Sequence, residues 1–280
     1  MPDTNAVPQV AIELKMVSAD SAGYKVFRDV NVAFPRGRFS VVLGATGSGK
    51  SALLKLAAGL MVPSGGIVEY LGRDMSRFTR KDEADFRAHS GFVFQDAALW
   101  ADTNILNNVA MPLRVHRPWM SQSEIAESVR LALKRIGYDE GMGYRPSDLS
   151  AGEQKMVSIA RAIVHDPDLI FMDDPGSSLD EDGLERLYEL LGELGEAGKT
   201  VIVVANNSEF AYRFADMLGV IKNETVVAFG GYDETLSRAS VELEGSLARL
   251  KARGGRSRKP RYPDSPAGDP GSEMSQRGDV

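Results

Sequence analysis

The sequence predicts an α/β fold in which a parallel sheet is flanked by helices and interrupted by a helical insertion. The first observation is a short apolar run, Phe39–Leu43, that leads through a glycine-rich loop into a helix-like segment at Ser51–Leu60. A strand, a glycine loop and a helix in this order form the βα unit of a nucleotide-binding fold. The second is the return of strand-like runs at Leu169–Asp173 and Thr200–Ala205, on either side of the helix-like Leu184–Leu194. Such alternation is typical of a parallel sheet.

Local hydrophobic patterns predict the remaining elements. Apolar and polar residues alternate at Val10–Val17, as in a half-buried strand, and a second strand is expected at Lys25–Phe34. Further short strands are expected at Met217–Ile221 and Val226–Phe229. The middle of the chain, Phe86–His165, has a mostly helical pattern.

One helix of this middle segment is marked by an apolar stripe. Ile125, Val129, Leu133 and Ile136 recur at helical spacing, so they would lie on one face of the helix. Gly137 is the expected end, because glycine readily adopts the left-handed conformation that closes helices.

Composition limits the classes of function. The chain has 280 residues, 43% of them hydrophobic, and 33 Lys and Arg against 39 Asp and Glu give a net charge of −6. This length predicts one large domain, or two lobes with a tail. The acidic balance argues against a nucleic-acid partner. The absence of cysteine excludes a disulfide scaffold, a thiolate metal site and a cysteine nucleophile.

The apolar stretches of the sequence are short. Ala57–Val62 and Val201–Ala205 are among the longest, and they fall far short of the about 20 residues that a bilayer-spanning helix needs. The first residues also lack the pattern of a secretory leader. We therefore expect a cytoplasmic protein whose membrane role comes through a partner.

The strongest motif is GATGSGKS at Gly44–Ser51, which matches G-x-x-x-x-G-K-[ST] in full. Its glycines let successive backbone N–H groups converge on phosphate oxygens. In this motif Lys50 would reach the β- and γ-phosphates of a nucleotide, and the Ser51 hydroxyl would ligate magnesium. The rest of the cradle would be formed by Gly44, Thr46, Gly47, Ser48 and Gly49.

A second candidate is the carboxylate that ends the apolar run Leu169–Asp173. A buried parallel strand would place Asp173 at its carboxyl end, beside the phosphate loop. There the carboxylate could hold the magnesium ion, directly or through water.

The string LSAGEQ at Leu149–Gln154 opens a helix. Ser150 and Glu153 have the spacing of a capping box, which explains these two residues as a helix start. The capping box explains neither Leu149 nor Gly152, so the string indicates something more than a helix start.

Together, the phosphate loop, the strand-terminal carboxylate and LSAGEQ resemble the ATP-binding subunit of an ABC transporter. The resemblance extends from about Val10 to Leu236, with the motifs in the same order. It implies a P-loop NTPase core of ABC type with an antiparallel β subdomain and an inserted helical lobe. We accordingly expect an ABC ATPase domain at 8–236, with the insertion at about 96–165, and a C-terminal helix with a disordered tail at 237–280.

The resemblance also implies roles for residues outside the phosphate loop. LSAGEQ corresponds to the family's LSGGQ signature, by which Ser150, Gly152 and Glu153 would contact the γ-phosphate of ATP held by the opposite subunit. The string Ser177–Asp180 is similar to the family's D-loop, which makes Asp180 a further candidate at the nucleotide.

Two more candidates lie in the first half of the chain. Gln95, in GFVFQD, stands at the family's Q-loop position, where it would ligate magnesium with Ser51 and Asp173 and link the ATPase core to the helical lobe. Tyr24 is a candidate for stacking on adenine, with an ordinary strand-edge tyrosine as the alternative.

Three positions depart from the family pattern. Asp174 stands at the place of the catalytic glutamate, and losing one methylene withdraws the carboxylate by about 1.5 Å, an error that can cost about 100-fold in rate. Asn206 stands at the place of the switch histidine, and its amide can donate a hydrogen bond but carries no proton or charge. Ala151 replaces a signature glycine. We expect ATP binding and dimer closure to survive, while hydrolysis by Asp174, Gln95 and Asn206 is slow or absent.

A further resemblance concerns lipid transport. Ala97–Arg114 is similar to the segment that follows the Q-loop in ATPases of Mce/Mla-type lipid transporters. Arg261–Pro263, in the tail, is similar to the C-terminal extension of some Mla ATPases. These features predict phospholipid transport, with Trp100 and Met111 near a permease contact or, alternatively, in the core of the helical lobe.

The implied partners are a second ABC ATPase subunit, in a homodimer or a heterodimer with a paralogue, and membrane permease subunits. The permease would hold this chain at the inner face of the cell membrane. ATP and Mg²⁺ are the implied ligands. Two alternatives stay open: a catalytically impaired structural or regulatory subunit that closes on ATP, and a single-cassette ABC protein without a transport role.

Overall fold

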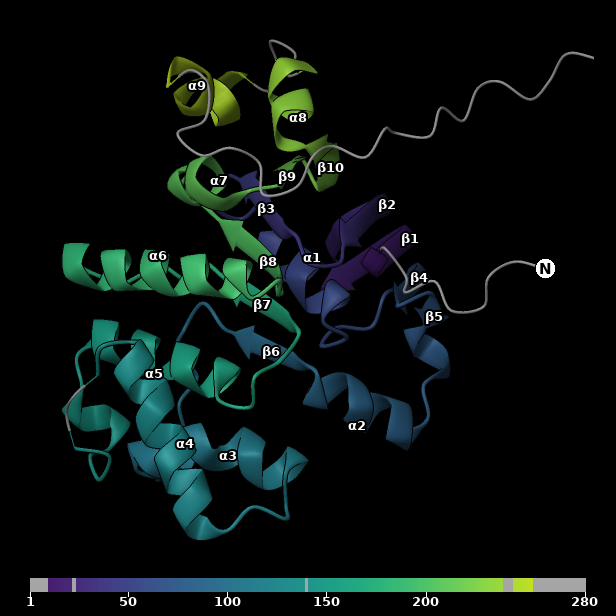
Figure 1. The fold of residues 1–280 in the computed structure, drawn as a ribbon. Helices are drawn as coiled ribbons and strands as arrows, with labels where there is room; N and C mark the ends of the chain where they lie inside the picture. The colour runs from purple at the N-terminus through teal and green to yellow at the C-terminus, as the bar shows by residue number, and fades with distance from the viewer. Residues whose placement is uncertain (1–9, 22–23, 139–140, 239–243, 254–280) are drawn as a thin grey trace, which may run out of the picture.

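The chain folds around two β-sheets (Figure 1). The coordinates are those of a computed structural model, which describes residues 10–21, 24–138, 141–238 and 244–253. Within these residues, the larger sheet has six strands in the order β10 (Thr225–Gly231), β9 (Met217–Lys222), β3 (Phe39–Gly44), β8 (Thr200–Ala205), β7 (Leu169–Asp173) and β6 (Ser90–Val93). Its strands are parallel except β10, which runs antiparallel to β9. The predicted α/β class is confirmed.

The register of the central strands brings two loops together. β8 lies between β3 and β7 and pairs with both in parallel, so that Ala205 lies beside Leu43 and Val204 beside Asp173. Every residue of β7 and β8 is buried, which explains their continuous apolar runs. The loops that follow β3 and β7 therefore leave the sheet at the same edge.

The smaller sheet is antiparallel, with the order β2 (Tyr24–Pro35), β1 (Val10–Ser21), β4 (Gly65–Tyr70) and β5 (Arg73–Asp74). The sequence patterns predict β1 and β2 but not β4 or β5. β4 begins with two glycines, which lower the strand propensity. Gly66 has φ +75°, and a Cβ on it would lie 2.2 Å from the backbone oxygen of Met16. Only glycine fits where β4 meets the irregular part of β1.

The helices surround the larger sheet and extend below it (Figure 1). α3, α4 and α5 gather at the end of the molecule away from the smaller sheet. In chain order the helical elements are α1 (Lys50–Ala57), the 3₁₀ turn Met75–Arg77, α2 (Arg80–Ala88), α3 (Ile105–His116), α4 (Gln122–Arg135), the 3₁₀ turn Pro146–Asp148, α5 (Ala151–Ile163), α6 (Glu181–Glu196), α7 (Glu209–Phe214), α8 (Tyr232–Arg238) and α9 (Glu244–Ala252).

The helical lobe is formed by α3, α4 and α5, which pack against one another. The predicted apolar stripe of α4 is confirmed, because Ile125, Val129, Leu133 and Ile136 are all buried in the main core. The end of the helix is also as predicted. Gly137 has φ +69°, and the following N–H, of residue 138, donates to the carbonyl of Leu133.

The prediction of a mostly helical segment at Phe86–His165 is wrong in one place. β6 lies inside this range and pairs in parallel with β7. The strand has only four residues and includes Gly91, so it carries too little periodicity to be recognised. That glycine is needed, because a Cβ on it would lie 2.2 Å from the backbone oxygen of Ala162 in α5.

The C-terminal helices pack onto the main body. Leu247 and Leu250 of α9 are fully buried, and Arg253 forms an ion pair with Glu209 of α7. The tail with Arg261–Pro263 lies outside the described residues. In the described part of the chain, no helix combines the length and the apolar character that crossing a bilayer requires.

His165 is buried where the helical lobe meets the larger sheet. Its Nε2 lies 3.1 Å from the carbonyl oxygen of Ser90, its ring lies beside that of His116, and its own carbonyl accepts a hydrogen bond from Arg117. Burial lowers the pKa of His165 to about 4, with a smaller contribution from the charges of His116 and Arg117. The contact with Ser90 and the carboxylate of Asp166 act in the opposite direction.

We predict that mild acid destabilises the protein through His165. An unfolded histidine binds a proton near pH 6.5, whereas the folded one binds it only near pH 4, so the unfolded state binds more protons between these values. Lowering the pH from about 7.5 to about 5 should cost about 2 kcal/mol through this residue. Urea unfolding at both values should show a correspondingly smaller loss in His165→Gln. The exposed His89→Gln is the matched control, and equal losses in wild type and His165→Gln would contradict the prediction.

Candidate functional site

The predicted phosphate loop connects the end of β3 to the start of α1. Gly47 and Gly49 both have left-handed backbone conformations, with φ +79° and φ +96°. A Cβ on Gly49 would lie 2.8 Å from the Phe27 ring, whereas one on Gly47 would meet nothing within 4 Å. Glycine is therefore needed for its conformation at both positions, and for close packing at Gly49 as well.

Lys50 closes the loop on itself. Its Nζ donates hydrogen bonds to the carbonyl oxygens of Gly44 (2.9 Å) and Ala45 (2.8 Å). The side chain is mostly buried, and burial lowers the pKa of Lys50, while Asp174 and Asp173 act to raise it. Since Lys50 is also the first residue of α1, its ammonium and the positive end of the helix dipole serve the same loop.

Ser51 and Asp173 meet at the foot of the loop. The Ser51 hydroxyl donates to Oδ1 of Asp173 over 3.0 Å. Asp173 is 3% exposed, and burial raises the pKa of its carboxyl, although the hydrogen bond from Ser51 acts to lower it. A hydroxyl and a carboxylate oxygen in contact are the kind of ligands that Mg²⁺ prefers.

A cleft of about 440 Å³, called the phosphate cleft below, opens beside these groups. Most of the predicted site residues line it: Thr46, Gly47, Gly49, Lys50, Ser51, Gln95, Asp173, Asp174 and Asn206. Gly44 and Ser48 lie in the same loop but not on the cleft wall. Sequence reasoning did not select the other lining residues: Val26, Ala52, Lys55 and Met61. The side chain of Tyr24 lies outside the described residues.

The two residues that depart most from the family pattern contact each other. Nδ2 of Asn206 donates to Oδ2 of Asp174 over 2.8 Å. They meet because β7 and β8 are neighbours, and the Asp174 N–H donates to the carbonyl of Val204. Asp174 also has φ +44°, a conformation that is uncommon for residues other than glycine. The backbone and Asn206 therefore both fix the position of this carboxylate.

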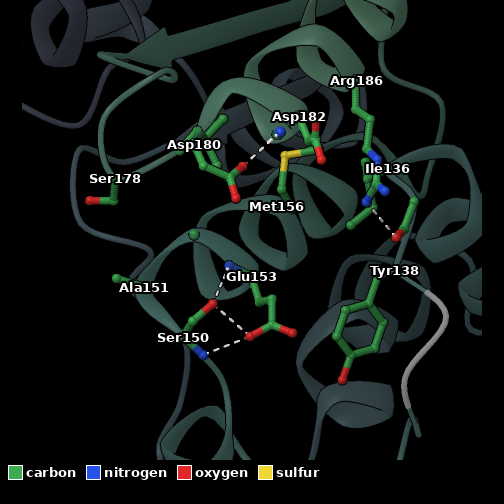
Figure 2. A pocket seen from close by; sticks show the side chains of 14 residues that line it. Ile136, Tyr138, Ser150, Ala151, Glu153, Met156, Ser178, Asp180, Asp182 and Arg186 are labelled. Atoms are coloured by element: carbon green, nitrogen blue, oxygen red, sulfur yellow. Dashed lines mark hydrogen bonds between the residues drawn. The ribbon is translucent and has the colours of Figure 1, made fainter.

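The remaining predicted residues line a different pocket. Ser150, Gly152, Glu153 and Asp180 surround a space of about 620 Å³ between the starts of α5 and α6 and the end of α4 (Figure 2). No residue lines both this pocket and the phosphate cleft. A single chain thus does not bring all the predicted residues together.

Figure 2 shows how Ser150 and Glu153 interact at the start of α5. The Ser150 hydroxyl and N–H donate to the Glu153 carboxylate (2.6 and 2.8 Å), and the Glu153 N–H donates to the Ser150 hydroxyl (3.2 Å). These bonds hold the pKa of Glu153 below its usual range. The capping box expected from the sequence is confirmed.

Close packing explains the glycine of LSAGEQ and the place of Asp180. A Cβ on Gly152 would lie 3.0 Å from the carbonyl oxygen of Ser178, so the loop after β7 presses against the start of α5. Asp180 caps α6 by accepting a hydrogen bond from the Gly183 N–H over 2.8 Å. Ala151 is exposed at the first position of α5.

Sequence reasoning missed two cations of α5. Lys155 and Arg161 each donate to two backbone carbonyls of the segment around Gln95. The signal available in the sequence was that both residues lie in the helix that begins at LSAGEQ. Lys155 is buried and Arg161 is partly buried, and a charged residue withdrawn from water needs a partner.

Comparison with known proteins agrees with this geometry. The sequence profile of the family described as "ABC transporter" matches residues 27–177, more than half of the chain. The chain belongs to this ABC transporter family. It is an ATP-binding cassette of the P-loop type, as the resemblance in its sequence implies.

Two relatives share most of the length of this ABC cassette. The intermembrane phospholipid transport system ATP-binding protein MlaF of Haemophilus influenzae is 31% identical over 236 residues, which cover 84% of this chain and 89% of MlaF. The probable ribonucleotide transport ATP-binding protein mkl of Mycobacterium leprae is 33% identical over 222 residues, 79% of this chain. The match spans 64% of the length of mkl, so mkl is considerably longer than the matched region.

Solved ABC cassettes have the same fold. The dimeric structure of MJ0796, a bacterial ABC transporter cassette, has a TM-score of 0.74 and 30% identity, covering 79% of this chain and 98% of that one. The same protein, in a dimeric post-hydrolysis state bound to ADP and phosphate, matches with a TM-score of 0.74, 29% identity and the same coverage.

We predict that the two left-handed glycines of the phosphate loop differ in their tolerance of alanine. Gly47→Ala should lower the free energy of unfolding by about 1–2 kcal/mol, because the left-handed backbone conformation is the only feature that disfavours alanine there. Gly49→Ala should cost about 1–3 kcal/mol more, since the new Cβ also displaces the buried Phe27 ring. Urea unfolding of the two variants provides the measurement, with each serving as the control for the other. Equal costs would show that the ring contact is unimportant.

Proposed function

We propose that this ABC cassette is the ATP-binding subunit of a membrane transporter. It would bind ATP with Mg²⁺ in the phosphate cleft and couple binding and slow hydrolysis to a membrane permease. The single observation that carries this proposal is the contact between Ser51 and Asp173 beneath a loop closed by Lys50. This arrangement suits a magnesium nucleotide better than any other ligand class.

The charges of the cleft support a divalent cation. The charged residues that line the cleft are Lys50, Lys55, Asp173 and Asp174, so the charges of the cleft balance and leave little to neutralise a triphosphate. Bound Mg²⁺ would neutralise phosphate charge there. Ser51, Asp173 and the Gln95 amide would hold the ion. In the part of the chain that the structure describes, no group of three or more acidic, histidine or cysteine side chains could bind a metal ion by itself, in this cleft or outside it. Mg²⁺ commonly takes one or two protein carboxylates and completes its shell with phosphate and water.

Slow hydrolysis follows from the pair of Asp174 and Asn206. We propose that Asp174 is the general base that accepts a proton from the attacking water. One of its oxygens already accepts a hydrogen bond from Asn206, and the carboxylate is a methylene shorter than the glutamate implied by the family pattern. Asn206 can donate a hydrogen bond toward the γ-phosphate only by leaving Asp174. The binding groups Lys50, Ser51 and Asp173 are thus intact, while the two groups on the water side, Asp174 and Asn206, compete with one another.

A second ABC subunit would complete each site. Ser150, Gly152, Glu153 and Asp180 line a pocket separate from the phosphate cleft, which supports a head-to-tail dimer in which they face the partner's nucleotide. The partner would be a second copy or a paralogue. The fold match to a cassette solved as a dimer supports the same arrangement.

A groove of about 470 Å³ supports contact with a permease. It lies between α3, α5 and β6, and its lining includes Trp100, Met111 and Val115. Trp100 and Val115 are 50% and 60% exposed, so two large apolar side chains lie together at the surface of this groove. We propose that permease subunits bind this groove and hold the chain at the cytoplasmic face of the membrane.

Phospholipid is the proposed cargo of the transporter. The name of MlaF refers to phospholipid transport, and the match covers most of that protein. The name of mkl refers instead to ribonucleotides, but the match covers less of its length. The segment Ala97–Arg114 resembles Mce/Mla-type ATPases and contributes to the permease groove, so both lines of support concern lipid.

The alternative function is a structural or regulatory subunit that closes on ATP without turnover. The specific observation in its favour is the occupied carboxylate of Asp174. A single-cassette ABC protein without a transport role would need neither a permease groove nor exposed Trp100. Reconstitution with candidate permease subunits, followed by a phospholipid-transfer assay, would discriminate these functions from lipid transport.

We predict that Lys50→Ala abolishes nucleotide binding. Removing the ammonium takes away the main cation of the phosphate loop, where charge-assisted bonds to phosphate are the strong ones. Isothermal calorimetry with Mg²⁺ and ATPγS should detect binding to wild type and none to the variant. Exposed Lys134→Met controls for the loss of a lysine charge. Full binding by Lys50→Ala would refute the proposed site.

We predict that Asp174→Glu with Asn206→His increases ATP hydrolysis by about tenfold or more, because the base regains its reach and the hydrogen-bond donor regains a titratable group. Phosphate release at saturating ATP measures kcat, and calorimetry should show an unchanged ATP affinity. The single variants separate the two contributions. If wild type turns over as fast as the double variant, the hypothesis of impaired hydrolysis is wrong.

A further inference from the structure

The backbone around Gln95 is held by α5. Nζ of Lys155 donates to the carbonyl oxygens of Phe94 (2.8 Å) and Gln95 (2.6 Å). Two turns farther along the helix, Arg161 donates to the carbonyls of Ala97 and Ala98 over 3.1 and 2.7 Å. Charge-assisted hydrogen bonds of this kind are roughly twice as strong as neutral ones. The segment 94–98 is therefore attached to the helical lobe at two points.

The attachment at Lys155 is costly to break. Its side chain is 2% exposed, and burial lowers the pKa of its ammonium. The carboxylates of Asp174, Asp173 and Asp96 attract the charge from outside the helix. A buried cation that loses its carbonyl partners cannot reach water. Lys155 and the backbone of residues 94 and 95 must therefore move together or separate at a high cost in free energy.

The same helix begins at the LSAGEQ string. Ser150 caps α5, and Lys155 follows within the next two turns of the helix. Ser150 and Lys155 thus belong to one continuous helix, whose turns are joined by backbone hydrogen bonds. A shift at Ser150 would reach the Gln95 carbonyl through one side chain, and Gln95 itself lines the phosphate cleft.

Ser177 makes a weaker contact with the same carbonyl. Its hydroxyl donates to the Asp174 carbonyl over 2.8 Å and lies 3.4 Å from the Gln95 carbonyl. The loop after β7 thus adds little to holding Gln95. The tight contact belongs to Lys155.

We propose that Lys155 is a positioning residue that ties Gln95 to α5, so that a nucleotide contacting Gln95 moves the helical lobe. This inference rests on the proposed nucleotide site. Lys155 would not touch the nucleotide itself and would act through Gln95. It lies on the helix that begins at LSAGEQ.

Trp100 provides a reporter for this link. The chain has two tryptophans, so Trp119→Phe leaves Trp100 as the single one. Trp100 is half exposed and lies two residues after the segment held by α5. Its backbone N–H donates to the buried Asn108 side chain of α3, and its backbone carbonyl accepts a hydrogen bond from the same side chain. In the Trp119→Phe background, Mg²⁺ and ATPγS should change the emission of Trp100. Lys155→Met should abolish this change, while calorimetry shows the same nucleotide affinity.

Two variants test whether the ammonium is the cause. Lys155→Arg keeps the charge and the donors and should restore the Trp100 response. Lys134→Met removes an exposed lysine of α4 and should leave the response intact. Methionine fills nearly the same buried volume as lysine, and urea unfolding checks that Lys155→Met is folded.

Hydrogen exchange separates this inference from the proposed function. Without nucleotide, Lys155→Met should speed amide exchange in segment 94–98 by about tenfold or more, the factor expected when hydrogen bonds to a charged group are lost. Unchanged exchange, or an unchanged Trp100 response, overturns the role of Lys155 even if ATPγS binds normally. Loss of nucleotide affinity in Lys155→Met would instead make it a binding residue. Wild type that binds no ATPγS would refute the proposed function, and the inference with it.

Discussion

The parallel pairing of β3 and β7 with the strand between them is the constraint on which the rest of the structure depends. This register places the phosphate loop, Asp173 and Asp174 at one edge of the sheet. β8 ends at the same edge and brings Asn206 to Asp174. Four parts of the candidate site, from three distant stretches of the sequence, therefore meet without any loop having to fold far back.

Buried amines organise the space around this edge. Lys50 donates hydrogen bonds to carbonyls of the phosphate loop, and Lys155 donates to the carbonyls of Phe94 and Gln95. In both cases a cation that lacks water compensates by holding backbone in place. The phosphate loop and segment 94–98 thereby acquire a defined shape. Lys50 lies in α1 and lines the cleft, whereas Lys155 lies in α5 and holds the backbone of Gln95, which lines the cleft.

Much of the fold and of the candidate site could be predicted from the sequence, because the patterns that indicate them lie within short stretches of the chain. The phosphate loop, the apolar runs of β7 and β8 and the stripe of α4 each carry their own periodicity or motif. β4, β5 and β6 lacked such a signal, since glycines and short length conceal their pairing. The hydrogen bond from Asn206 to Asp174 and the anchoring by Lys155 depend on strand order and helix packing. No local pattern encodes contacts between residues that are 32 or 60 positions apart.

The separation of the two pockets has a consequence for any mixed assembly. In the proposed head-to-tail dimer, Asp174 and Asn206 would serve the nucleotide held by this chain, whereas Ala151 would face the nucleotide held by its neighbour. The unusual residues of one chain are thus shared out between two reaction centres. A paralogue with every standard residue would rescue neither centre completely, because each would still receive half of its parts from this chain.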